Sequence, residues 1–431
     1  MDIGPAPVRD WKVRPLADDF VKVYRSPDAR RVYCYSPGLA VCPTGRLVAT
    51  LDLGGPGVGK LPGPKHARGE MGWGWQGKVF TSDDRGRTWT HRADFPFLHA
   101  RPFVAGRRLY VLGQAGDLAI LRSDDWGESF SAPARLTDGQ RWHQAPGNVH
   151  YANGCVYLVM ERRVARRVKG WNVSENAPVL MRAKTSDDLT RPESWTFATE
   201  LPFYEAACDR DLDSFGVPFY GVYYPASAAV APGRECAPVG WLETHVVQFR
   251  DPNHLWHDPA GKTFHLWMRA HTGGTGYACI AKVVEKPDGS MTTMLESAPS
   301  GKKVLFVPCP GGQMKFHILH DGRTRLYWLL STQATDSMTR PERLSPKRYN
   351  LPNNERRRLQ LHFSKNCIDW CFAALVAAGP ADNASRHYAG MAIDGDDLHV
   401  LSRSGSRAAR SAHDGNLITF HTLRDFRRLA Y

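Results

Sequence analysis

The chain repeats one local pattern: a short apolar segment, a turn containing Gly or Asp-Gly, and a second segment rich in Val, Leu, Tyr and Trp. Hardly a window shows apolar residues at helical spacing, and paired runs that flank a Gly turn are typical of β-hairpins. The clearest examples are Gly38–Leu51, Pro102–Leu112, Asn148–Val159, Val246–Trp267, Phe316–Leu330 and Tyr388–Leu401. The sequence therefore predicts an all-β protein.

Hairpins that recur at the length of a four-stranded sheet indicate a β-propeller, because each blade of that fold buries its faces only against its neighbours. We expect a single β-propeller domain of about six blades over residues 1–431. A seventh blade is compatible with the stretch before Ser36. A strand from that N-terminal stretch is expected to complete the last blade and close the ring.

Residues 202–238 interrupt the hairpin pattern, because they are rich in Pro, Gly and Ala and show no paired strands. We interpret them as an insertion or long loop. Asp209, Asp211 and Asp213 alternate within it, which suits a structural calcium loop or a solvated acidic loop. The downstream Glu of an EF-hand is absent, which favours the solvated loop. No cofactor and no catalytic metal are expected.

The formal net charge of +13 predicts a surface field that attracts polyanions such as nucleic acid, acidic glycans or anionic lipid. Basic residues are mostly dispersed, and the two clusters at Arg162–Lys169 and Arg356–Arg358 accompany no nucleic-acid-binding motif. We therefore expect an acidic glycan as the partner and no nucleic acid. The longest apolar runs fall far short of the ~20 residues of a transmembrane helix, so no membrane partner is expected.

The 9 Cys occur singly, without a CxxC pair, which favours buried, reduced thiols over a disulfide framework. The first residues lack the basic start and apolar core of a secretory signal. That is compatible with a cytoplasmic protein and equally with a periplasmic or secreted one whose signal has been removed.

One motif occurs twice, each time after an apolar strand. Its copies are Ser82-Asp-Asp84-Arg-Gly86-Arg-Thr-Trp89 and Ser123-Asp-Asp125-Trp-Gly127-Glu-Ser-Phe130. We expect the Ser and Asp side chains to accept hydrogen bonds from backbone N–H groups of a tight turn, with Gly at positive φ and the aromatic ring packed between sheets. The motif matches the Asp-box, and the chain resembles the sialidase superfamily of propellers from Ser36 to Tyr431. The resemblance implies an exo-acting glycosidase with its site on the propeller axis.

The chain departs from classical sialidases in two respects. It has no Arg-Ile-Pro signature, and no Tyr and Glu pair is recognisable from the sequence. A second resemblance is to the propellers that act on rhamnose linked to glucuronate, which include hydrolases and lyases. It rests on Trp142-His143-Gln-Ala-Pro146 and on the strand Ala177–Arg182.

Residues near a propeller axis come from the entries to innermost strands and from the exits of second strands. For hydrolysis, two carboxylates or an equivalent pair must flank the scissile bond, and Glu161 and Glu243 are the candidates. For β-elimination beside a uronate, a His or Tyr removes the C5 proton, and His143, supported by His99 or Tyr388, is suited to that step.

Basic and aromatic side chains at the same positions are expected to bind a carboxylate or sulfate, since Arg matches such groups bidentately. The substrate-binding candidates are Arg101, Arg162, Arg269, His271, Lys315, Arg386 and Tyr388. We therefore predict an exo-acting glycoside hydrolase of the sialidase-like type that acts on an anionic glycan. A polysaccharide lyase and a non-catalytic glycan-binding propeller are the alternatives.

Overall fold

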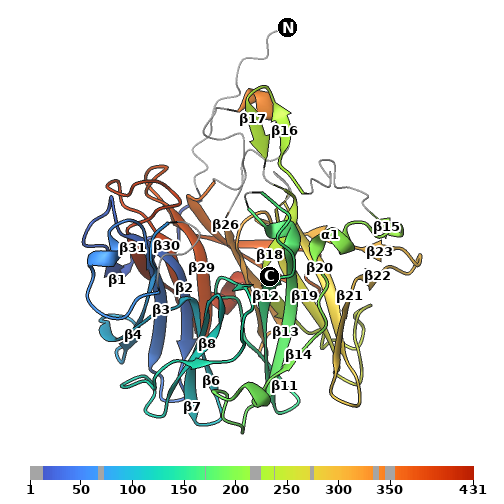
Figure 1. The fold of residues 1–431 in the computed structure, drawn as a ribbon, viewed down its shortest axis with the longest axis horizontal. Helices are drawn as coiled ribbons and strands as arrows, with labels where there is room; N and C mark the ends of the chain where they lie inside the picture. Colours follow the sequence, from blue (N-terminus) through green and yellow to red (C-terminus); the bar gives the residue numbers. More distant parts are fainter. Residues whose placement is uncertain are drawn as a thin grey trace.

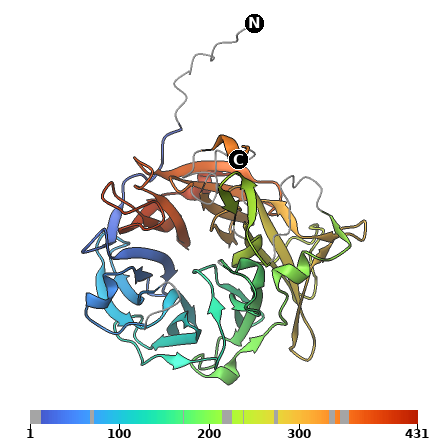
Figure 2. The same cartoon turned by 45° about the horizontal axis from the view of Figure 1, so that its top comes forward.

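The structure is a computed structural model that describes residues 13–66, 72–169, 171–213, 225–236, 238–271, 276–332, 339–344 and 355–431. Six antiparallel sheets, one per blade, stand around a central axis (Figures 1 and 2). The predicted propeller is thus confirmed, with six blades rather than seven. No helix in the described ranges is long and apolar enough to cross a membrane.

The first three blades follow each other along the chain, and each runs from its innermost strand outward. Blade 1 contains β2 (Tyr33–Val41), β3 (Leu47–Gly54), β4 (Gln76–Ser82) and β5 (Thr90–Phe95). Blade 2 contains β6 (Leu98–Ala105), β7 (Arg108–Ala115), β8 (Asp117–Ser123) and β9 (Ala134–Arg135). In blade 3, β10 (Trp142–His143) and β11 (His150–Ala152) both pair with β12 (Cys155–Arg163), followed by β13 (Asn176–Lys184) and β14 (Thr196–Phe197).

The other three blades complete the ring. Blade 4 contains β18 (Gly240–Val247), β19 (Thr263–His271), β20 (Tyr277–Glu285) and β21 (Met291–Met294), with β24 (Phe306–Pro308) also on β20. Blade 5 contains β25 (His317–Asp321), β26 (Leu326–Thr332), β27 (Arg358–Ser364) and β28 (Cys371–Ala378). Blade 6 contains β29 (Arg386–Asp394), β30 (Asp397–Ser404) and β31 (Leu417–Leu423), with β1 (Val21–Arg25) as its outer strand. The predicted closing strand from the N-terminal stretch is therefore β1.

The hydrophobic core is divided among the gaps between blades. Leu47 and Phe420 pack between blades 1 and 6, for example, and Trp328 and Leu398 pack between blades 5 and 6. Every neighbouring pair of blades shares one such cluster of buried apolar residues. Burial of apolar surface is the main favourable term in folding, so each blade depends on both neighbours for its stability.

The two motif turns have closely similar hydrogen bonds. Ser82 Oγ accepts from the Gly86 N–H at 2.8 Å, and Asp84 accepts from the Thr88 N–H at 2.9 Å and the Thr88 hydroxyl at 2.6 Å. Gly86 has a φ of 86°, and the Trp89 ring lies 5.3 Å from that of Phe420. The same bonds recur in the second turn, whose corresponding residues are Ser123, Asp125, Gly127, Ser129 and Phe130. These turns stabilise the outer ends of blades 1 and 2.

The expectation that residues 202–238 contain no paired strands is wrong. They contain a short helix, α1 (Phe203–Ala206), the strand β15 (Leu212–Asp213), and a hairpin of β16 (Ala228–Ala231) and β17 (Arg234–Cys236) that projects from the ring in Figure 1. β15 runs parallel to β23 (Lys303–Val304), which also pairs with β22 (Glu296–Ser297). The hairpin was missed because its first strand is mostly Ala, which has a low strand propensity.

Candidate active site

Four of the innermost strands are bulged at corresponding positions. The pairing with the second strand shifts by one residue in β2, β6, β18 and β29. Within each bulge lies a non-Gly residue in the left-handed region, with φ of 35° at Ser36, 56° at His99, 62° at Glu243 and 50° at Tyr388. Such conformations cost energy and concentrate at functional sites. The bulges therefore mark this end of the axis as the candidate site.

Glu243 and Tyr388, from blades 4 and 6, meet at the axis around one guanidinium. Arg269 on β19 donates from Nη1 to the Tyr388 hydroxyl at 2.8 Å, and the same nitrogen lies 3.4 Å from Glu243 Oε2. Burial raises the pKa of Tyr388, and the negative charge of the nearby Glu243 carboxylate adds to that increase. A neutral phenol is thus held beside a carboxylate that can accept its proton.

Two further arginines lie over the Tyr388 ring. The guanidinium carbons of Arg403 and Arg356 are 5.1 Å and 5.4 Å from the ring centroid. Both side chains are buried, and neither has a carboxylate partner among the described residues. The Nε atom of each also has no hydrogen-bond partner there. Together with Arg269 they make the surroundings of Tyr388 strongly cationic.

Glu161 lies beside this group on blade 3. Its Oε1 accepts from both the backbone N–H and the hydroxyl of Thr244, each at 3.0 Å, which places it next to Glu243. Burial raises the pKa of Glu161, and the negative charge of Glu243 adds to that increase. Its Oε2 lies 3.6 Å from His143 Nδ1. The side chain of His143 is 38% exposed, so it is the member of this pair that solvent reaches.

His99 extends the cluster towards blade 1. Its ring lies edge-on to that of His143 with centroids 4.9 Å apart, and its Nδ1 is 2.6 Å from Gln114 Nε2. Its backbone N–H donates to Asp52 at 2.8 Å. Burial lowers the pKa of His99 well below its ordinary value and raises that of Asp52 well above it. Both groups are therefore held towards their neutral forms.

Several buried polar atoms at the axis have no hydrogen-bond partner in the described structure. They include both amide atoms of Gln313, Asp52 Oδ1 and Glu161 Oε2. Protein interiors pair nearly all such groups, so a concentration of unpaired ones indicates a place that water or substrate completes.

The structure brings together most of the predicted site residues. Glu243, Tyr388 and Arg269 form one group, and His143, His99 and Glu161 form its neighbour. Lys315 and Arg101 are buried on the axis, and His271 lies against Trp171 with ring centroids 4.6 Å apart, next to Arg269.

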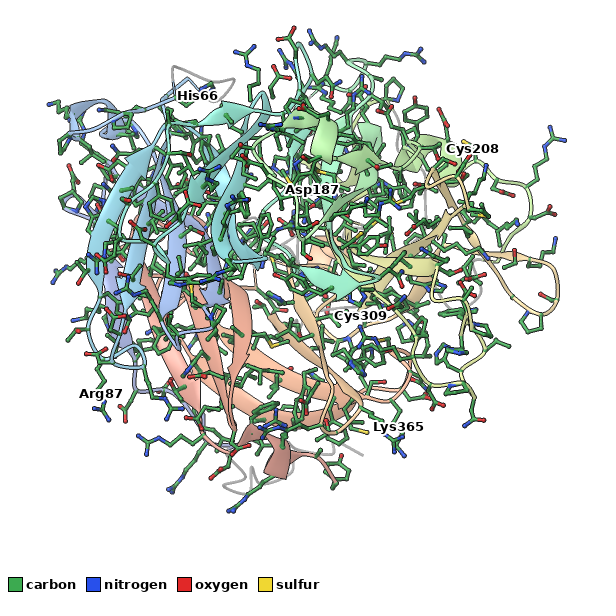
Figure 3. All side chains as sticks on the ribbon, turned by 90° about the horizontal axis from the view of Figure 1, so that it is seen from below. His66, Arg87, Asp187, Cys208, Cys309 and Lys365 are labelled. Atoms are coloured by element: carbon green, nitrogen blue, oxygen red, sulfur yellow. The ribbon has the colours of Figure 1, made fainter. Side chains whose placement is uncertain are left out.

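Arg162 and Arg386 do not join these groups. Arg162 is 37% exposed and pairs with Glu200. Arg386 places its guanidinium 4.8 Å from the Phe20 ring and donates to the carbonyls of Ser385 and Gly405. Two other basic residues, Arg87 and Lys365, lie at the outer surface and point away from the ribbon in Figure 3.

Arg356 was missed as a site residue. It belongs to the basic cluster Arg356–Arg358, which was not among the predicted substrate-binding residues. Arg356 comes just before β27 of blade 5, and its guanidinium lies over the Tyr388 ring. That position before a blade strand is the sequence feature that could have marked it as a site residue.

Metal ligands do not gather in the described part of the chain, where no three His, Cys, Asp or Glu side chains are arranged to hold an ion. Asp209 accepts from the Asp211 N–H at 2.8 Å, and Asp211 lies 3.5 Å from Lys302 Nζ. The Asp213 side chain, the third member of the calcium alternative, lies outside the described residues.

Known structures share this architecture at low sequence identity. A Hadza microbial sialidase matches with a TM-score of 0.55 and 14% identity, over 94% of this chain and 68% of the sialidase. A Trypanosoma rangeli sialidase mutant displaying trans-sialidase activity matches with a TM-score of 0.52 and 12% identity, over 97% of this chain and 60% of that one. A Fusarium graminearum α-L-arabinofuranosidase matches with a TM-score of 0.50 and 9% identity, over 95% and 98%.

The sequence comparisons give no match: no protein-family model and no curated protein matches this chain. The structural likeness, at identities of 9 to 14%, establishes the fold. The chain is a six-bladed, sialidase-like β-propeller.

Proposed function

We propose that this protein is an exo-acting glycoside hydrolase that removes a terminal sugar from an anionic glycan, with Tyr388 as nucleophile. The observation that carries the proposal is the buried contact of Tyr388 with Glu243 and Arg269. A glycosidase needs a nucleophile and a base that activates it, and sialidases use a Tyr in place of the usual carboxylate.

In the proposed first step, the Tyr388 oxygen attacks the anomeric carbon while Glu243 takes the phenol proton. The bond from the anomeric carbon to the leaving oxygen breaks, and that oxygen receives a proton from the His143–Glu161 pair. His143 is the exposed member of the pair, and the raised pKa of Glu161 favours a proton held there. Water then attacks the anomeric carbon and gives its proton to the His143–Glu161 pair, while the bond to the Tyr388 oxygen breaks and Tyr388 recovers its proton from Glu243.

The cationic surroundings of Tyr388 support an anionic sugar as substrate. Arg356 and Arg403 are without a described carboxylate partner, and Arg groups bind carboxylates bidentately. A neutral phenol also suits such a substrate, because a carboxylate nucleophile would repel a negative charge beside the anomeric carbon.

Product analysis on acidic glycans tests this proposal. Purified protein would be assayed on sialosides, rhamnose-capped glucuronate glycans and sulfated oligosaccharides, with neutral arabinosides for comparison. We expect a saturated terminal sugar with the mass of one water added. Tyr388→Phe should lower kcat by roughly a thousandfold or more, because a nucleophile replaced by a phenyl ring cannot form the covalent intermediate. Tyr151→Phe is the matched control, since its hydroxyl donates to the Val104 carbonyl outside the site.

A lyase is the second candidate, and the contact between His99 and His143 favours it. A neutral His99 and a solvent-accessible His143 are suited to moving a proton from C5 of a uronate. An unsaturated product that absorbs ultraviolet light, formed without added water and retained in Tyr388→Phe, would establish this function instead. Binding of a glycan without any turnover would reject both enzymes in favour of a glycan-binding propeller.

A further inference from the structure

Four basic side chains surround the propeller axis beside the site. They are Arg101 on β6, His245 on β18, Lys315 just before β25, and His317 on β25, and none is more than 5% exposed. Lys315 donates from Nζ to the Ala389 carbonyl of blade 6 at 2.8 Å. The rings of His245 and His317 face each other with centroids 5.1 Å apart. Each of the four groups, which come from blades 2, 4 and 5, is close enough to affect the charge of another.

The hydrogen bonds of these groups leave donors unused. The Met391 N–H donates to His317 Nδ1 at 3.2 Å, so a neutral His317 carries its proton on Nε2. That Nε2 has no partner in the described structure, and neither has Arg101 Nε. Lys315 has three N–H bonds, and one described acceptor takes one of them. Several N–H groups are therefore buried at the axis without an acceptor.

The nearby carboxylates are already engaged. Glu243 is shared by Arg269 and Tyr388, and Glu161 accepts two hydrogen bonds from Thr244. Within the described residues neither Arg101 nor Lys315 has an ion pair. Burial lowers the pKa of Lys315 to about 7 and that of Arg101 to about 9. The charges of Glu161 and Glu243 offset part of these decreases, and a further anion would stabilise the charged forms of both groups.

We propose that the axis binds a chloride ion, held by Lys315, Arg101 and His317. A monatomic anion accepts hydrogen bonds from any direction, which suits N–H donors contributed by different blades. The residues that would hold the ion differ from the arginines over Tyr388, and the proposal does not depend on the catalytic reaction.

Thermal unfolding of the full chain tests this site. Chloride or bromide would replace methanesulfonate at constant ionic strength, so that only the identity of the anion changes. We expect Tm to rise with the logarithm of the chloride concentration, by about 1–2 °C once chloride exceeds its dissociation constant roughly tenfold. Lys315→Met should abolish the chloride-dependent increase. The control Lys302→Met should keep it, because Lys302 is 52% exposed and lies 3.5 Å from Asp211, away from the axis.

Diffraction from wild-type crystals soaked in bromide decides the case even if Lys315→Met fails to fold. An anomalous peak between the side chains of Lys315 and Arg101 would locate the ion. A wild-type protein with no halide-dependent Tm and no peak at this position would overturn the proposal. It would also be overturned if the chloride effect disappeared in Arg403→Gln and persisted in Lys315→Met, since the ion would then sit against Tyr388.

Discussion

Replacing Asp321 by Asn should loosen the attachment of the C-terminal segment to blade 5. Asp321 ends β25 and is 4% exposed, and it accepts from Arg427 Nε at 2.8 Å and Nη2 at 2.9 Å. Arg427 belongs to the 3₁₀ helix Phe426–Leu429, whose Phe426 packs edge-on against Trp328 with centroids 4.9 Å apart. The bidentate pair therefore fixes the orientation of this helix on the blade.

The size of the effect follows from the Asp321 carboxyl group. Its hydrogen bonds to Arg427 and Thr324 outweigh the effect of burial and lower its pKa from 3.8 to about 2. At 1.36 kcal/mol per pKa unit, a shift of 3.8 − 2 corresponds to about 2.4 kcal/mol at neutral pH. Arg427 stays 16% exposed and partly solvated, so we expect Asp321→Asn to cost about 2 kcal/mol. For a chain of this length, that lowers Tm by about 2 °C.

Urea unfolding at pH 7 and pH 3 measures this difference. A lowered folded-state pKa gives stability that is complete above about pH 4 and is lost as the pH falls towards 2. The wild type should therefore exceed the variant by about 2 kcal/mol at pH 7 and by roughly half as much at pH 3. Asp396→Asn is the control, because Asp396 also contacts Arg427 but is 68% exposed. A difference below about 0.5 kcal/mol at pH 7, or one that is equal at both pH values, would refute the reasoning.

Two further predictions concern a motif turn and the pH dependence of catalysis. Gly86→Ala should lower the stability far more than Gly45→Ala, although both Gly have positive φ. A Cβ at Gly86 would lie 2.1 Å from Phe420, whereas none of the described atoms is within 4 Å of a Cβ at Gly45. Equal Tm losses in the two variants would show that contact with Phe420 is unimportant. If the raised pKa of Glu161 keeps it protonated for acid catalysis, kcat should fall as the pH rises through that pKa. Glu161→Gln should then remove the decrease of kcat at high pH. An unchanged profile in Glu161→Gln would exclude Glu161 as the titrating group.

The sequence predicted the propeller well because each blade is made mostly of consecutive strands. The hairpin of β2 and β3 is marked by its apolar runs and by Gly45, which has the φ of 83° that the turn requires. Such short-range patterns are visible in a single sequence. Counting these hairpins gave the prediction of about six blades.

The contact between Glu243 and Tyr388 was beyond sequence reasoning, although both residues were selected separately. Each lies in a bulge, and one inserted residue changes which side chains point towards the axis. Nothing in the local residue types specifies that shift, since Glu and Tyr rarely adopt positive φ. The sequence gives no sign of this pair because the two residues come from different blades and are far apart along the chain.

The closing strand β1 imposes an order on the assembly of the molecule. Val21 pairs with Phe420 across blade 6, and His421 donates to the Ala17 carbonyl at 2.7 Å, from 404 positions further along the chain. Ribosomal synthesis releases the early blades long before β31 exists, so β1 must wait without a partner. The strand that carries Tyr388 is also among the last to emerge. Glu243 consequently meets its tyrosine only when the ring closes, and circular permutants that start between two earlier blades should move that event to another point in synthesis.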